Sequence, residues 1–112
     1  MNNEEKVLGK IDFAEFGTIG DYPFMIGLQL GFSLGGGTSG VMDGGKYTVN
    51  ISSDCNWKEV NREEGITKVV EKVNDILKDA KVNYVSQLKG KPVEVTLVNY
   101  TFRDFRILTE VL

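Results

Sequence analysis

The stretch from Phe24 to Leu34 alternates without interruption between large apolar residues and small or polar ones. Its apolar positions are Phe24, Ile26, Leu28, Leu30, Phe32 and Leu34. The positions between them hold Met25, Gly27, Gln29, Gly31 and Ser33. A strict period of two is typical of a β-strand with one buried face. The chain must therefore fold around a sheet that has a core on one side of this strand and a smooth surface on the other.

Shorter segments with the same alternation predict more strands. We expect them over 7–16, 47–52, 92–98 and 102–108. The period places Ile11, Phe13 and Glu15 on one face of the first strand. The last two strands form a hairpin across 99–101, and a further short strand is expected around Val41 and Met42.

One segment has helical periodicity. Apolar residues recur there every third or fourth position, as Ile66, Val69, Val70, Val73, Ile76, Leu77 and Ala80. Asn61, three residues before Glu64, forms a capping-box pattern and predicts the start of this helix. Asn83 is expected to cap a short turn over 85–88.

The order of these elements predicts an α+β fold. Strands lie at both ends of the chain around one main helix, so we expect an antiparallel sheet, the helix on its apolar face and a closing C-terminal hairpin. A chain of 112 residues predicts a single domain, 1–112. One helical stripe cannot cover a sheet of about five strands. The uncovered part must face water or another subunit, and we expect a homo-oligomer.

The composition excludes several classes of protein. The chain has no histidine and one cysteine, which argues against an enzyme, a metal centre or a cofactor. A net charge of −3 without a basic run argues against binding of a nucleic acid polymer. No apolar segment is long enough to span a membrane, and residues 1–6 do not resemble a signal peptide. These features predict a cytoplasmic protein.

Glycine is concentrated in residues 35–45, directly behind the alternating strand. The letters GGGTSG at 35–40 match G-x-G-x-x-G, but residues 41–45 cannot start the helix that a dinucleotide motif needs. Two interpretations stay open. The segment is either a hairpin connection or a loop whose free amides bind an anionic ligand.

Aromatic residues, arginines and amides in other loops are candidates for the same role. A nucleotide site needs a stacking surface, guanidinium groups for phosphate and amides for the base edge. The candidate ligand-binding residues are Phe16, Tyr22, Gly36, Gly37, Thr38, Trp57, Asn99, Tyr100, Arg103 and Arg106.

The layout of the chain resembles a known family. The glycine- and aromatic-rich N-terminal strands, then Trp57, then a helix ending in ILKDAKVNYVSQL and the hairpin GKPVEVTLVNYTFRDFRILTEVL are similar to the phage-encoded anti-Thoeris sponge proteins. Those proteins sequester the cyclic ADP-ribose isomer made by bacterial TIR proteins. The resemblance implies an oligomer that holds a signal nucleotide without cleaving it.

Three functions are therefore to be distinguished. The first is a phage counter-defence protein that sequesters a small cyclic nucleotide signal. The second is a protein–protein inhibitor, or a phage accessory subunit, that docks on a host defence protein. The third is an enzyme that uses paired carboxylates.

Overall fold

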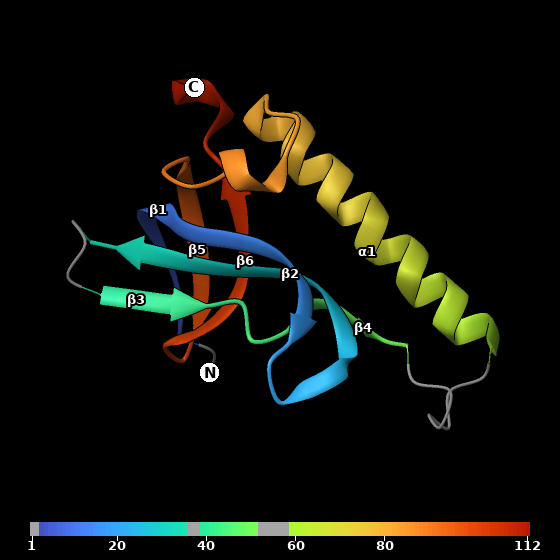
Figure 1. The fold of residues 1–112 in the computed structure, drawn as a ribbon. Coiled ribbons are helices and arrows are strands. Elements are labelled where there is room, and N and C mark those ends of the chain that lie inside the picture. Colours follow the sequence, from blue (N-terminus) through green and yellow to red (C-terminus); the bar gives the residue numbers. More distant parts are fainter. Residues whose placement is uncertain (1–2, 36–38, 52–58) are drawn as a thin grey trace.

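The computed structural model describes residues 3–35, 39–51 and 59–112. Within them, six strands form one antiparallel sheet and a long helix packs on one face of it, as Figure 1 shows. The strands are β1 (Glu4–Ile19), β2 (Tyr22–Leu34), β3 (Ser39–Met42), β4 (Tyr47–Asn50), β5 (Pro92–Val98) and β6 (Thr101–Ile107). The helices are α1 (Glu59–Ala80) and the short 3-10 turns η1 (Val85–Gln87) and η2 (Thr109–Val111).

The order of the strands in the sheet is β3-β2-β1-β5-β6, and every pair is antiparallel. β2 is long enough to pair with β3 through residues 31–34 and with β4 through residues 25–28. β5 and β6 form the C-terminal hairpin. The predicted α+β fold, with the helix on the sheet and a closing hairpin, is confirmed.

The sheet is rolled. Neighbouring strands lie about 4.8 Å apart, so β2 and β6, three places apart in the order, would be about 14 Å apart in a flat sheet. The rings of Phe32 on β2 and Phe102 on β6 nevertheless stack with centroids 5.3 Å apart. Figure 1 shows the β2–β3 pair crossing the β5–β6 pair at a steep angle. The core therefore lies inside the roll.

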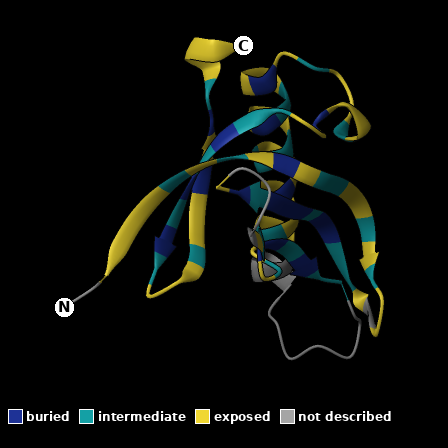
Figure 2. Cartoon of the chain, turned by 90° about the vertical axis from the view of Figure 1, so that its left-hand side faces the viewer, coloured by how far each residue is buried: buried dark blue, intermediate teal, exposed yellow. Residues whose placement is uncertain are grey.

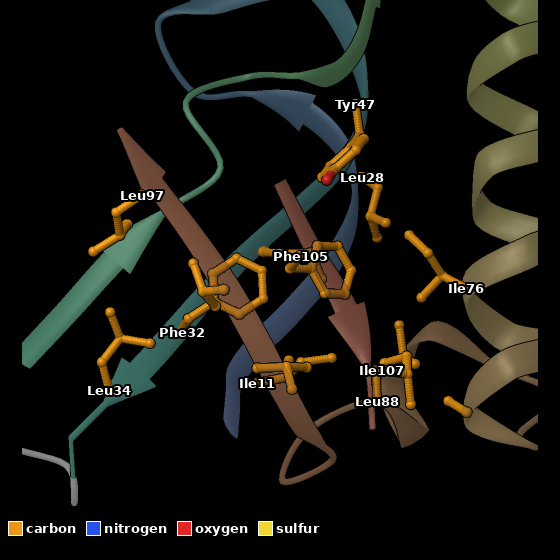
Figure 3. Packing of buried hydrophobic residues seen from close by; sticks show 14 residues of the cluster. Ile11, Leu28, Phe32, Leu34, Tyr47, Ile76, Leu88, Leu97, Phe105 and Ile107 are labelled. Atoms are coloured by element: carbon orange, nitrogen blue, oxygen red, sulfur yellow. The ribbon is translucent and has the colours of Figure 1, made fainter. Parts of the chain in front are cut away.

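The interior of the roll is apolar and closely packed. It includes Leu28, Leu30, Phe32 and Leu34 from β2, Val93, Val95 and Leu97 from β5, and Phe105 and Ile107 from β6. Figure 3 shows Phe32 and Phe105 side by side within this cluster, with Ile76 of α1 approaching from the helix side. Figure 2 shows the buried positions gathered in the middle of the sheet, with the hairpin turns and the start of β1 exposed. The alternating stretch thus builds the core as predicted, although Phe24 at its start is 40 % exposed.

A β-bulge in β1 changes which residues share a face. Ile11 pairs with Phe32 and Phe13 pairs with Gly31, which leaves Asp12 as an extra residue. Ile11 is buried in the core, whereas Phe13 lies on the other face of the sheet. The prediction that Ile11 and Phe13 share a face was wrong. The extra residue between them shifts the strand by one position, so the residues after it face the opposite side of the sheet from the one that the period of two predicts.

Two glycines of β2 lie where neighbouring groups leave no room for a side chain. A Cβ on Gly31 would lie 2.6 Å from Cδ1 of Phe13, whose ring covers this position. A Cβ on Gly27 would meet the Tyr47 carbonyl and lie 2.7 Å from Cα of Thr48. The glycines on the outer face of β2 therefore allow a ring and the backbone of β4 to approach closely.

Helix α1 begins at Glu59, two residues before the predicted cap. Asn61 therefore lies within the helix, and its assignment as the N-cap was wrong. The apolar stripe packs mainly through Val69, Ile76 and Ala80, while Val70 is 58 % exposed.

The segment after α1 turns back sharply toward the sheet. Lys81 has a φ of 59°, and the Val82 N–H donates to the Leu77 carbonyl at 3.0 Å, as in a Schellman motif. Asn83 does not cap the next turn. Instead, the side-chain oxygen of Gln87 accepts the N–H groups of Asn83 and Tyr84, both at 3.0 Å. This turn carries the buried Leu88 into the core.

Among the helices of the described segments, none combines the length and the apolar character that a membrane span needs.

Candidate functional site

A cleft of about 400 Å³ opens where β4, α1 and β6 meet. Its volume lies within the range of small-molecule sites, about 300–1,000 Å³. The residues that line it are Lys46, Tyr47, Thr48, Gly65, Lys68, Val69, Lys72 and Asp104. Gly65 packs closely on Val49 of β4, so the helix and the strand meet at the base of the cleft. The rolled sheet brings β6 to the same place.

Three lysines surround this cleft. Lys46 stands just before β4, and Lys68 and Lys72 lie one turn apart on α1. Like charges at this spacing destabilise a helix by about 0.2–0.5 kcal/mol. Within the described part of the chain, neither Lys68 nor Lys72 forms an ion pair with a carboxylate. The cleft therefore concentrates positive charge in a chain whose net charge is −3.

Lys46 joins the two edges of the rolled sheet. Its ammonium group donates to the Arg103 carbonyl of β6 and lies 3.9 Å from Oδ1 of Asp104. The same nitrogen lies 5.9 Å from the centroid of the Phe102 ring. An ammonium group has three N–H donors, so these contacts leave donor capacity for a ligand. The protein contacts of Lys46 thus hold its ammonium group at the cleft and leave some of its N–H donors available.

Tyr47 forms an aromatic wall of the cleft. Lys72 Nζ lies 5.7 Å from the centroid of its ring, within the range of a cation–π contact. The hydroxyl is buried and has no hydrogen-bond partner among the described residues. Figure 3 shows it at the end of the ring that faces away from α1. Burial raises the pKa of Tyr47, and the carboxylates of Asp104 and Asp43 raise it further. The phenol is therefore neutral around pH 7.

Asp43 holds the turn that presents Lys46. Its carboxylate is buried and accepts the N–H of Leu30 at 3.0 Å and that of Gly45 at 3.1 Å. Burial raises the pKa of Asp43, and these two hydrogen bonds oppose the rise. The carboxylate thereby ties the β3–β4 turn to β2 and sets the position of Lys46 at the end of that turn.

The described residues that the sequence predicted for a site lie in separate places. Asn99 and Tyr100 form the β5–β6 turn beside the start of β1, where the backbone N–H of Asn99 donates to the Asn3 carbonyl. Phe16 lies near the far end of β1, half-exposed, and Tyr22 begins β2. The structure does not bring these two groups together.

The two arginines of the predicted set are both on β6. Arg106 forms ion pairs with Glu94 and Glu110, each at 3.2 Å, outside the lysine cleft. Arg103 is the extra residue at a register shift, and its carbonyl accepts the hydrogen bond from Lys46. Gly36, Gly37, Thr38 and Trp57 lie outside the described residues.

Sequence reasoning did not select the residues that line the cleft. The spacing of Lys68 and Lys72 was a usable signal, because two lysines one helical turn apart share a face. Lys46 and Asp104 carried no such signal, since only the rolling of the sheet brings them together. In the segments that the structure describes, no group of three or more His, Cys, Asp or Glu side chains could hold a metal ion.

Comparison with family models, with curated proteins and with solved structures found no match to this chain.

Proposed function

We propose that the protein binds a small phosphate-bearing nucleotide in the lysine cleft and holds it without converting it. The observation that carries this proposal is the convergence of Lys46, Lys68 and Lys72 on one cavity of about 400 Å³. Two of these ammonium groups have no carboxylate partner in the described chain.

The charge of the cleft favours a phosphate group. Of the lining residues that the structure describes, three ammonium groups and the carboxylate of Asp104 together give a formal charge of +2. A phosphate monoester or a diphosphate matches this charge, and its oxygens accept several charge-assisted hydrogen bonds from lysine. Val69 and Tyr47, which are 8 % and 4 % exposed, add a small apolar part of the lining that a base or a ribose can contact.

Binding without conversion agrees with the residues available. The chain has no histidine, and the raised pKa of Tyr47 leaves its phenol a poor proton donor or acceptor near neutral pH. The resemblance to anti-Thoeris sponge proteins narrows the proposed ligand to a cyclic ADP-ribose isomer and the setting to the cytoplasm of a phage-infected bacterium. The protein would then act by removing a signal from solution.

Recovery of bound nucleotide tests the proposal. The purified protein is mixed with cyclic ADP-ribose or ADP-ribose, separated from free ligand by ultrafiltration, and heated to release what it holds. Mass spectrometry of the released material should show intact nucleotide. A new product would indicate an enzyme, and no retention of either compound would refute nucleotide binding by this cleft.

Matched variants place the binding in the cleft. Lys68→Gln and Lys72→Gln should each weaken binding by about tenfold or more, because each removes a charged hydrogen-bond donor. Lys78→Gln is the control, since it makes the same change on an exposed part of the same helix outside the cleft. Equal effects of all three variants would mean that only net charge matters.

Docking on a host protein is the second candidate function, and the outer face of the sheet favours it. Met42 on β3, Gly31 on β2 and Phe13 on β1 form a row across this face. Met42 and Leu8, which lies on the same face, are 54 % and 62 % exposed. Loss of a partner in a pull-down with Met42→Lys, while nucleotide retention is unchanged, would support this function. The expected homo-oligomer stays a prediction, which the mass by light scattering tests.

A further inference from the structure

Among the described residues that line the lysine cleft there is one carboxylate, Asp104, whose presence a purely anionic ligand does not explain. We infer that Asp104 selects ligands that carry a hydrogen-bond donor beside their phosphate, such as a nucleotide with free ribose hydroxyls. This inference rests on the proposed function, because it concerns which phosphate compounds the same cleft accepts. It predicts discrimination between a nucleotide and inorganic phosphate compounds of the same charge.

The two oxygens of Asp104 are in different situations. Oδ1 accepts the backbone N–H of Phe105 at 2.8 Å, and Lys46 Nζ lies 3.9 Å from the same oxygen. Oδ2 makes no hydrogen bond to any residue that the structure describes. The side chain is 57 % exposed. One oxygen therefore holds the carboxylate in place while the other is available as an acceptor.

The contact between Asp104 and Lys46 does not account for the carboxylate. A separation of 3.9 Å is longer than a charge-assisted hydrogen bond, about 2.7–2.9 Å. Both side chains are about half exposed, and exposed pairs of this kind contribute little to stability. Lys46 is held as well by the Arg103 carbonyl, which is a backbone group that any residue could supply.

A carboxylate in this place opposes the binding of any anion. It lies among the groups that attract phosphate and reduces their formal charge from +3 to +2. This repulsion is offset only when the ligand donates a hydrogen bond to the carboxylate. A ribose hydroxyl can do so, because O–H donation to a carboxylate is a short and strong hydrogen bond. Inorganic phosphate and pyrophosphate have no hydroxyl group on carbon, and near neutral pH their only donor is a P–OH of the phosphate group that the lysines attract.

The position of Asp104 on an edge strand allows it to reach a bound ligand. It belongs to β6, the last strand in the sheet order, and it borders both the lysine cleft and a smaller hollow of about 140 Å³ that Lys6, Thr96 and Arg106 also line. Among the described residues it makes no ion pair with Lys6 or Arg106. The cleft side is the one where three ammonium groups gather.

The test compares ligands that all contain a diphosphate but differ in the hydroxyl groups that can donate a hydrogen bond. Binding of inorganic pyrophosphate, ADP and 2′,3′-dideoxyADP is measured by calorimetry for the wild-type protein and for Asp104→Asn. The variant should bind pyrophosphate about threefold more tightly, because a repulsive charge is removed. It should bind ADP about tenfold more weakly, because the charged acceptor is lost. 2′,3′-DideoxyADP lacks both ribose hydroxyls, so the variant should bind it slightly more tightly than the wild-type protein does, as with pyrophosphate.

Asp104→Asn is expected to strengthen pyrophosphate binding and to weaken ADP binding. These opposite changes in affinity distinguish selection of a hydrogen-bond donor from simple repulsion of anions. If Asp104→Asn strengthens pyrophosphate and ADP by the same factor, the carboxylate only repels anions and the inference is wrong while nucleotide binding stands. If the wild-type protein binds neither compound, both the inference and the proposed function fail. Asp79→Asn serves as the control, since it removes the same charge from α1 outside the cleft and should change neither affinity.

Discussion

Gly27 occupies the position where β2 lies between two other strands, paired with Gly17 of β1 on one side and with Thr48 of β4 on the other. An alanine there would place its Cβ against the Tyr47 carbonyl and 2.7 Å from Cα of Thr48. Both are backbone atoms, so the contact cannot be relieved by a side-chain rotation. Gly27 also has a φ of 156°, which L-residues rarely adopt.

The expected effect of Gly27→Ala is a loss of about 3 kcal/mol in the free energy of unfolding. Overpacking of a well-packed region costs about 1–3 kcal/mol, and the upper end applies because a strand must move. Tyr47 and Val49 would move with it, and both are buried in the interior. The free energy of unfolding of a small domain is about 5–15 kcal/mol in total. This variant would therefore remain folded, but its urea midpoint would be markedly lower.

Gly17→Ala is the matched control, because Gly17 is the direct partner of Gly27 and a Cβ there has nothing within 4 Å. Replacing a strand glycine without a clash should gain about 0.5–1 kcal/mol. Urea unfolding followed by far-UV circular dichroism gives both values. Equal midpoints for the two variants, or a loss below about 0.5 kcal/mol for Gly27→Ala, would contradict the close approach of β4.

Three further predictions concern the hairpin, the buried acid and the outer ion pairs. Tyr100→Gly should raise the free energy of unfolding by about 1 kcal/mol in a urea titration, because Tyr100 has a φ of 66° and glycine follows asparagine well in such turns. Burial raises the pKa of Asp43, so its contribution to stability is complete below its ordinary pKa of 3.8 and is lost as pH rises through the raised value. Wild-type protein should therefore lose stability relative to Asp43→Asn as pH increases from about 4 in thermal scans, and a constant difference would contradict this. Arg106→Ala should leave nucleotide retention unchanged in the filtration assay, because Arg106 is paired with glutamates outside the cleft.

Much of the fold followed from local patterns. The period of two in β2 and in β5 predicted their buried faces, because a half-buried strand must alternate. The helix was predicted from the repeat of apolar residues at every third or fourth position, because a half-buried helix must show that repeat. Its first turn was misplaced. The bulge at Asp12 left no recognisable mark in the sequence, and it reversed the faces of Ile11 and Phe13. A bulge depends on pairing with a neighbouring strand, which no single segment specifies.

The residues of the candidate site were harder to predict from the sequence than the fold. Loop aromatics and arginines were chosen for their chemistry, and the described ones lie at both ends of β1 and along β6. The cleft instead depends on lysines, which are ordinary surface residues in most helices. Lys46 and Asp104 lie 58 positions apart in the chain and meet only because the sheet is rolled.

The pairing of β1 with both β2 and β5 has a consequence for the newly made protein. Residues 4–10 pair with residues 92–98, so during synthesis they have no β5 partner until that strand has left the ribosome. Until then this end of β1 presents unpaired backbone groups to other chains, and such an edge readily recruits foreign strands. Rapid overproduction should thus favour aggregates of nascent chains, and slower translation or a holdase chaperone should improve the yield.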